Sequence, residues 1–383
     1  MPNIIDLYAG AGGLSLGASR AGFKVAAAIE IDKHAIETHQ RNFPKTAHIA
    51  RDIQSVSVGD IEVASGINRT DIAGVIGGPP CQGFSSIGHG NVEDERNLLF
   101  KRFFEIVRDI HPIFFVAENV PGIIREKYNR IRQEAFKLVK GDYKILDPIL
   151  VNASQYGAAT SRTRYFFVGL RKDSGINLSV EDFIKIKVPE EGRTVVCQAL
   201  EGLPVNLQFS KEQTGIATVD KHYSDKRRKH IQNSFFYFRV TDSIPEGVGN
   251  PSFVKRYKKR HETNGFLMTD HTIEVEQRYR KLQYGEQDKI SKSYKLNPSS
   301  FCPTLRAGTG PDKGSFQAVR PIHYMEARVI NPREAARLQG FPDWFELPGT
   351  IWHSFRQIGN SVSPIAAEAI LKVIYDHLSN CAD

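Results

Sequence analysis

Short apolar runs alternate with amphipathic stretches through the first half of the chain. Each apolar run ends near a glycine turn or a carboxylate, which is typical of buried strands in a parallel sheet. Strands are expected at residues 4–8, 25–29, 75–76, 113–117 and 165–170, with helices at 14–21, 34–42 and 97–110. Because strands alternate with helices, the pattern predicts an α/β fold with a mostly parallel sheet and helices on both faces.

The pattern changes after residue 171, where the sequence becomes polar and weakly periodic. Two basic runs lie there, at residues 226–229 and 255–260, and helical patterns return at 332–338 and 364–378. We therefore predict two domains. The larger comprises residues 1–187 and 347–383, and a smaller irregular domain with a hinge comprises residues 188–346.

The composition narrows the class of protein. The chain has 383 residues, 40% of them hydrophobic, and a net charge of +8, which indicates a folded core and permits a polyanionic partner. No apolar run reaches the roughly 18 residues that span a bilayer, and the first residues lack the pattern of a signal peptide. The four cysteines are far apart and no metal-ligand spacing occurs, so we expect a reducing cytoplasm and no metal.

A glycine turn after the first strand indicates a ligand site. Gly10, Gly12 and Gly13 let the backbone approach a ligand near a helix N-terminus. Glu30 ends the second strand, where nucleotide-binding sheets place the carboxylate that binds ribose, and Asp52 is a further candidate, for an adenine amino group. The alternative is an ordinary turn with solvated acids. The GxGG spacing fits an adenosine cofactor without a pyrophosphate better than a dinucleotide.

Three further strand ends carry reactive side chains. Cys81 lies in a Gly/Pro-rich loop and is a candidate thiolate nucleophile, whereas we interpret the other cysteines as structural. Glu118 follows an apolar strand, so desolvation is expected to favour its neutral form as a proton donor; the alternative is a strand-end cap. Arg162 and Arg164 are expected on one side of a strand, with a solvated edge pair as the alternative. The structural cysteines are Cys197, Cys302 and Cys381.

Together these segments resemble the DNA cytosine-5 methyltransferase family, in the family's order along most of the chain. The matching segments begin at the cofactor loop, where Tyr8 replaces the usual Phe, and continue through a nucleophile loop and a proton-donor motif to a paired-arginine motif and two late motifs. They are residues 6–13, 79–82, 118–120, 155–164, 333–342 and 357–362. The arginine motif departs from the family, because Ala159 and Thr160 stand where Pro-Gln is common.

The resemblance implies covalent catalysis on a cytosine that is flipped out of the duplex. Cys81 would add to C6 of the base, and Glu118 would protonate or hydrogen-bond N3. Arg164 would hold the base through O2, Arg162 would position the loop, and Asn119 would fix the Glu118 loop. Residues 83–91 have the small side chains of a lid that closes over the base, with a plain surface loop as the alternative.

The same resemblance implies S-adenosyl-L-methionine as the cofactor and S-adenosyl-L-homocysteine as its product. The implied cofactor contacts are Tyr8, Gly10, Gly12, Gly13, Leu14, Glu30, Ile31, Asp52, Ile53, Pro79, Leu99, Asn360 and Ser361. The implied DNA contacts, which combine the active-site loop with the basic runs, are Gln82, Ser85, Lys226, Arg227, Arg228, Lys255, Arg256, Lys258 and Lys259.

The segment from Lys221 to Arg260 contains eleven basic and three acidic residues, so it alone accounts for a charge equal to the net +8. A basic run is often only a solvated surface, but in a recognition domain it indicates contact with phosphates. The resemblance implies a monomeric, sequence-specific enzyme that acts on double-stranded DNA in a bacterial cytoplasm, with a separately encoded restriction endonuclease. The alternatives are a tRNA cytosine-5 methyltransferase, a catalytically silent DNA-binding protein and a nicotinamide oxidoreductase.

Overall fold

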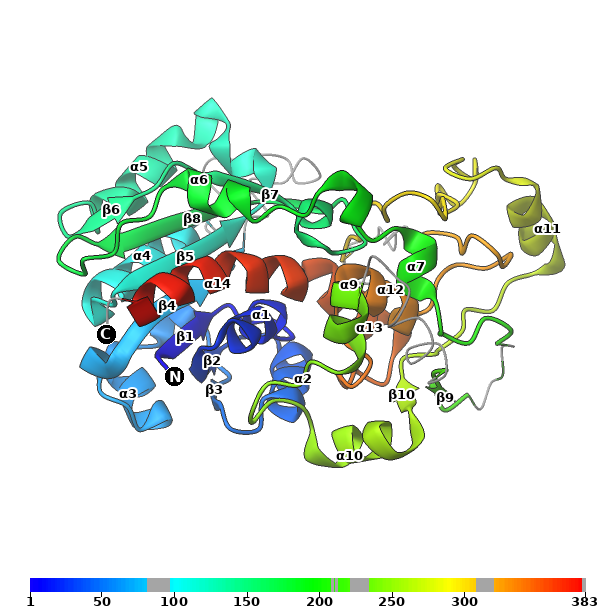
Figure 1. Ribbon diagram of the computed structural model, residues 1–383, viewed down its shortest axis with the longest axis horizontal. Coiled ribbons are helices and arrows are strands. Elements are labelled where there is room, and N and C mark those ends of the chain that lie inside the picture. Colours follow the sequence, from blue (N-terminus) through cyan, green and yellow to red (C-terminus); the bar gives the residue numbers. More distant parts are fainter. Residues whose placement is uncertain (81–96, 208–209, 211–212, 221–233, 308–319, 381–383) are drawn as a thin grey trace.

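A central eight-stranded sheet organises the first half of the molecule (Figure 1). The computed structural model describes residues 1–80, 97–207, 210, 213–220, 234–307 and 320–380. The sheet order is β3-β2-β1-β4-β5-β8-β6, and β7 also pairs with β8. The strands are β1 (Asn3–Leu7), β2 (Lys24–Ile29), β3 (Ala47–Ile49), β4 (Ile72–Gly77), β5 (Phe114–Asn119), β6 (Tyr143–Ile145), β7 (Ile149–Asn152) and β8 (Thr163–Arg171).

Strands β1 to β5 are parallel, whereas β8 runs antiparallel to β5, β6 and β7. In the β5–β8 register, Glu118 pairs with Phe166 and Asn119 with Tyr165. The first residues of β8 therefore lie beside the last residues of β5. This mixed but mostly parallel sheet confirms the predicted fold class, and each predicted strand is present, with bounds shifted by a few residues.

Helices cover both faces of the sheet, as expected. Neighbouring residues of β5 divide between two apolar clusters, because Phe114 contributes to the cluster with α1 and α14 and Phe115 to the cluster with α3, α4 and α5. The helices of this half are α1 (Gly13–Ala21), α2 (Lys33–Asn42), α3 (Val58–Ser65), α4 (Asn97–Ile110), α5 (Asn129–Lys137), α6 (Val180–Lys185) and α14 (Pro364–Asn380).

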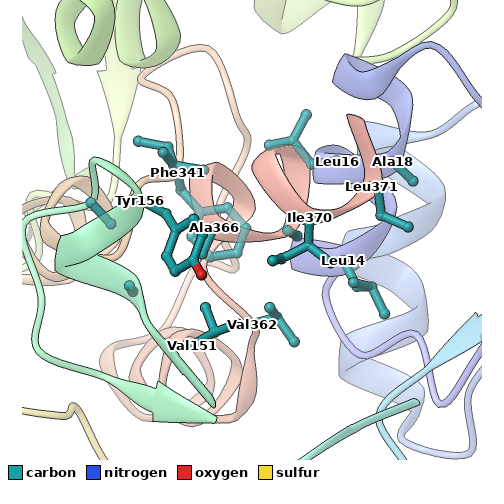
Figure 2. Close-up of a cluster of buried hydrophobic side chains, with 14 of the residues drawn as sticks. Leu14, Leu16, Ala18, Val151, Tyr156, Phe341, Val362, Ala366, Ile370 and Leu371 are labelled. Atoms are coloured by element: carbon teal, nitrogen blue, oxygen red, sulfur yellow. The ribbon is translucent and has the colours of Figure 1, made fainter. Parts of the chain in front are cut away.

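Helix α14 packs directly against α1, although the two are at opposite ends of the sequence. Figure 2 shows Ile370 and Leu371 of α14 beside Leu14 and Leu16 of α1, and all four are buried. The contact is close because Gly17 faces it, where an added Cβ would lie 2.4 Å from the Cβ of Ala367. The last helix therefore supports the helix that follows the glycine turn.

The second half has short elements and long connections, and Figure 1 shows α11 as its outermost helix. Its elements are α7 (Val196–Leu200), β9 (Ile216–Thr218), α9 (Ser234–Thr241), α10 (Pro251–Arg260), β10 (Glu262–Asn264), α11 (Ile273–Lys281), α12 (Pro332–Gln339) and α13 (Ile351–Asn360). One buried cluster includes Leu14, Phe236 and Trp344, so apolar packing continues from the sheet into this half. The division at residues 188 and 346 stays a prediction. Among the described helices, none is long and apolar enough to cross a membrane.

Candidate active site

The glycine turn after β1 leaves no space for a side chain at two of its three glycines. Gly12 has a left-handed φ of 98°, and an added Cβ would lie 2.3 Å from the ring of Phe43. At Gly13 an added Cβ would lie 2.4 Å from the carbonyl oxygen of Val362. Only glycine satisfies both restrictions. The turn is thereby held against α2 on one side and against the segment that follows α13 on the other.

Glu30 closes this turn from β2. Its Oε2 accepts a hydrogen bond from the backbone N–H of Gly10 at 2.8 Å, and its Oε1 accepts one from Asp32, also at 2.8 Å. Burial raises the pKa of Glu30, although these backbone donors oppose the shift. The carboxylate is thus fixed beside the glycine turn, and each oxygen keeps a second lone pair for a further donor such as a ribose hydroxyl.

Other predicted cofactor residues surround the same turn. Tyr8 adopts a left-handed φ of 61° and donates from its hydroxyl to the carbonyl oxygen of Leu99 at 2.7 Å. Ile31 is 67% exposed beside Glu30, and Asp52 is exposed at the start of a short 3-10 helix (Ile53–Ser55). The side chain of Asp52 accepts from Gln54 N at 2.9 Å, which adds a capping role to the predicted one.

The end of β5 contains an ion pair. Arg164 Nε lies 2.8 Å from Glu118 Oε1, and both side chains are at most 15% exposed. The other carboxylate oxygen of Glu118 is close to Gly78, where an added Cβ would lie 3.1 Å away. Glu118 therefore has a guanidinium as its partner at the end of β5.

Asn119 joins the ends of two neighbouring strands. Its side-chain nitrogen donates to the carbonyl oxygen of Pro79 at 3.4 Å, and its side-chain oxygen accepts from Val120 N at 2.9 Å. Asn119 is fully buried, so these bonds are shielded from water. The residue fixes the loop after β5 to the loop that leads into Cys81.

Arg162 has different partners from Arg164, although we expected both on one side of the strand. Its buried guanidinium donates to the backbone oxygens of Leu305, Gly359 and Asn360 at 3.3, 2.9 and 3.3 Å. Burial lowers its pKa well below the usual value. Arg162 therefore connects the start of β8 to the Asn360–Ser361 segment, and the Cβ of Ser361 lies 3.1 Å from where an added Cβ of Gly13 would stand.

Thr160 explains how the departure in the arginine motif is accommodated. Its hydroxyl donates to the carbonyl oxygen of Cys302 at 3.0 Å and accepts from Arg162 N at 3.3 Å. Sequence reasoning missed this role, because residue 302 is distant in the sequence. Cys302 is fully buried, as we expected for a structural cysteine, and Cys197 is half-buried.

Several predicted residues lie outside the described part of the chain. These are Cys81, Gln82, Ser85, Lys226, Arg227, Arg228 and Cys381, together with the expected lid at residues 83–91. Pro79 and Pro80 are described, and they place the start of the Cys81 loop at the end of β4.

The cations of the second basic run lie on α10. Lys255, Lys258 and Lys259 are exposed on it, whereas Arg256 is half-buried with its guanidinium 4.9 Å from the ring centre of Phe253. Gly249, just before α10, donates to the carbonyl oxygen of the last residue of α2 at 2.6 Å. This hydrogen bond places the start of α10 beside the last residue of α2, at the end of that helix that is further from Glu30 along the chain.

Comparisons with known proteins agree with this geometry. Residues 2–376 match the family described as C-5 cytosine-specific DNA methylase. The type II methyltransferase M.XorII of Xanthomonas oryzae pv. oryzae is 37% identical over 372 residues, which cover 96% of this chain and 82% of that protein. M.DdeI of Desulfomicrobium norvegicum is 31% identical over 410 residues, covering 99% of this chain and 89% of that one.

Solved structures give the same result. A candidate DNA modification methyltransferase encoded within a prophage (E. coli) has a TM-score of 0.85 and 46% identity, covering 99% of this chain and all of that one. The Dnmt2 methyltransferase of S. pombe has a TM-score of 0.56 at 16% identity, with all of both chains covered, which shows a shared fold alone.

Proposed function

The chain belongs to the C-5 cytosine-specific DNA methylase family and is a DNA cytosine-5 methyltransferase, and from this premise we propose how it acts. It methylates one cytosine within a specific duplex sequence, with Cys81 as the nucleophile. The observation that carries the proposal is the meeting of Glu118, Arg164 and Asn119 at the strand ends beside Pro79. The loop that begins there contains Cys81 and follows β4, and the glycine turn follows β1, which pairs directly with β4.

The residues around the glycine turn fit an adenosine cofactor. Gly12 and Gly13 let the turn pack closely where no Cβ fits, and Glu30 keeps acceptor capacity for ribose. We assign S-adenosyl-L-methionine to this site, held by the thirteen residues from Tyr8 to Ser361 named above. When bound, it supplies an activated methyl group for C5 of cytosine and leaves as S-adenosyl-L-homocysteine, with no metal required.

The protein's side chains perform the remaining steps on the base. The Cys81 thiolate forms a bond to C6, and the electron pair of the C5–C6 bond becomes available at C5. Glu118 donates a proton or hydrogen bond to N3, so that negative charge does not accumulate on the ring. Arg164 binds O2 of the base while paired with Glu118. After methylation, a proton acceptor removes the proton from C5 of the cytosine. The C6–sulfur bond then breaks and regenerates the Cys81 thiolate.

The target atom is inaccessible inside a duplex, so the cytosine leaves the base stack to reach Cys81. Unstacking costs a few kcal/mol, which contacts in the pocket offset. Residues 83–91 close over the flipped base, Gln82 and Ser85 contact the DNA, and the basic runs contact phosphates. The domain at residues 188–346 recognises the sequence, and the enzyme acts as a monomer in a bacterial cytoplasm beside a separately encoded restriction endonuclease.

Two experiments test the proposal. Methyl transfer from labelled cofactor is measured on duplex DNA and on tRNA, and transfer to DNA is expected. Activity on tRNA alone defeats the DNA assignment. Bisulfite sequencing of DNA from a host that expresses the protein then identifies the methylated cytosine and its sequence context together.

The covalent step has its own test. Cys81→Ala is expected to abolish turnover while binding of S-adenosyl-L-methionine remains, because the thiol is not among the cofactor contacts. Cys197→Ala is the matched control and keeps activity. Methylation by the Cys81→Ala variant would refute the covalent step without affecting the assignment of the cofactor.

A further inference from the structure

Four polar side chains form a hydrogen-bonded series from the end of β1 to the protein surface. Ser15 Oγ donates to Asp6 Oδ2 at 2.5 Å, and His39 Nε2 lies 3.0 Å from Ser15 Oγ. His39 Nδ1 lies 2.9 Å from His48 Nε2. Asp6, Ser15 and His39 are fully buried, whereas His48 on β3 is half-buried and reaches solvent. We call these four residues the Asp6 relay.

The direction of each proton follows from the number of protons available. A hydroxyl has one proton, and Ser15 gives it to Asp6, so it must accept from His39 Nε2. Burial lowers the pKa of His39 well below its usual value and that of His48 to about 4, so both rings are neutral and each has one N–H. His39 Nδ1 therefore accepts from His48 Nε2, and with Asp6 ionised every donor in the relay points towards it.

Asp6 is an unusual carboxyl group. It precedes the glycine turn by four residues, it has no exposed surface, and its Oδ1 has no hydrogen-bond partner among the described residues. Burial raises its pKa to about 7, Ser15 opposes this shift, and the charge of Glu30 adds to it. The titratable groups that face Asp6 and its relay are Glu30 on the β2 side, His39 on α2 and His48 on β3.

We propose that the Asp6 relay makes the cofactor site select the positively charged methyl donor over its neutral product. This inference rests on the proposed placement of the cofactor at the glycine turn. S-adenosyl-L-methionine has a sulfonium and therefore one more positive charge than S-adenosyl-L-homocysteine. A carboxylate in a buried setting attracts such a charge far more strongly than it does in water.

The relay supplies a path for the proton that Asp6 loses when the positively charged ligand binds. When Asp6 is neutral, it donates to Ser15 Oγ, Ser15 donates to His39 Nε2, and His39 Nδ1 donates to His48 Nε2. When the cation binds, each of these three protons crosses its own hydrogen bond, and His48 releases the proton of its Nδ1 to solvent. The donors then point towards the ionised Asp6. When the methyl group has left, the neutral product no longer holds Asp6 ionised, and a proton returns by the reverse path.

Calorimetric binding of both ligands tests this selection without measuring turnover. With a pKa near 7, the ionised fraction of Asp6 rises about tenfold between pH 6 and pH 8. The affinity for S-adenosyl-L-methionine is therefore expected to rise up to about tenfold over this range, and that for S-adenosyl-L-homocysteine to change less than about twofold. Titration at pH 7 in two buffers of different ionisation enthalpy should show release of about half a proton with the first ligand and none with the second.

Three variants separate the relay from general structural effects. Asp6→Asn keeps the shape of the side chain and should remove the pH dependence of the affinity ratio. Ser15→Ala removes the hydrogen bond that lowers the pKa of Asp6, so the midpoint of the ratio should move to higher pH. His39→Gln is the matched control, since its amide can still donate to Ser15 and accept from His48, and it should keep the equilibrium ratio.

The outcomes distinguish this inference from the proposed function. An affinity ratio that does not change with pH in the wild-type protein overturns the inference, as does an Asp6→Asn variant with an unchanged slope. If Asp6→Asn does not fold, the titrations of the wild-type protein and of Ser15→Ala still test whether the affinity ratio depends on the ionisation of Asp6. Failure of both ligands to bind would instead refute the cofactor assignment itself. Glu30 contacts the ribose in both ligands, so that contact cancels in the ratio.

Discussion

Replacing Arg162 with methionine should weaken cofactor binding more than it destabilises the fold. Methionine has a similar length but no donors, so three backbone oxygens lose a charged partner. Each such bond stabilises the folded protein by about 1.5–3 kcal/mol. The variant, however, avoids the cost of burying a charge, which is several kcal/mol. These effects nearly cancel in the free energy of unfolding, and we expect it to change by less than about 2 kcal/mol.

The local effect does not cancel, because two of the three oxygens belong to Gly359 and Asn360. Even one of these bonds contributes about 1.5 kcal/mol to the ordering of residues 359–360. Its loss is therefore expected to weaken cofactor affinity roughly tenfold. Calorimetric titration with S-adenosyl-L-homocysteine measures this affinity, and urea unfolding measures the stability. Arg162→Lys should recover part of the affinity, since an ammonium can still donate to one or two of the same oxygens.

Arg164→Met is the matched control on the same strand. Arg164 pairs with Glu118 and has no hydrogen bond to residues 359–360. We expect its cofactor affinity to stay within twofold of wild type while turnover falls at least a hundredfold. If Arg162→Met binds cofactor normally, or if Arg164→Met loses the binding instead, the division of roles between the two arginines is wrong.

Three further predictions concern charge and reactivity. Neutralising Lys255, Arg256, Lys258 and Lys259 should weaken DNA binding and reduce the slope of log affinity against log salt by up to about 3.6. An unchanged slope would show that the cations of α10 form only a solvated surface. Burial opposes ionisation of Asp288, but Arg278 at 2.6 Å and the N–H of Ser291 lower its pKa to about 2. Because this lies below the unfolded value of about 3.9, the pair should stabilise the fold at neutral pH and lose that effect between about pH 4 and pH 2, a dependence that Asp288→Asn should lack in urea unfolding. Burial raises the pKa of Cys302 to about 12, so mass spectrometry should find it unmodified by iodoacetamide in the native protein at pH 8 and modified after unfolding.

The sequence predicted best where the chain is locally periodic. Residues 113–117 form a continuous apolar run that suits a strand buried on both faces, and α4 has the expected bounds at Asn97–Ile110. In contrast, α10 buries only Phe253 and Tyr257 among exposed cations, so its hydrophobic pattern is too weak to identify. Helix α13 was missed because its residues were interpreted only as a motif.

The site shows the same limit at the level of single residues. Motif spacing identified Glu118 and Arg164, which meet through neighbouring strands. It could not separate Arg162 from Arg164, because the partners of Arg162 are up to 198 residues away in the sequence. The Asp6 relay was also missed. Its only local signal is a polar residue, Ser15, among the otherwise apolar buried residues of α1.

The packing of α14 against α1 has a consequence for synthesis. Helix α1 ends at Ala21, whereas α14 begins at Pro364, so the ribosome makes the second helix about 340 residues after the first. At a translation rate of roughly 5–20 residues per second, α14 is synthesised between about 17 and 70 s after the leucines of α1 that it covers. The glycine turn is supported by Val362 and the helix beyond it, so a nascent chain that lacks these residues lacks the support of the turn to which we assign the cofactor. We therefore expect an incomplete copy of this enzyme not to modify DNA.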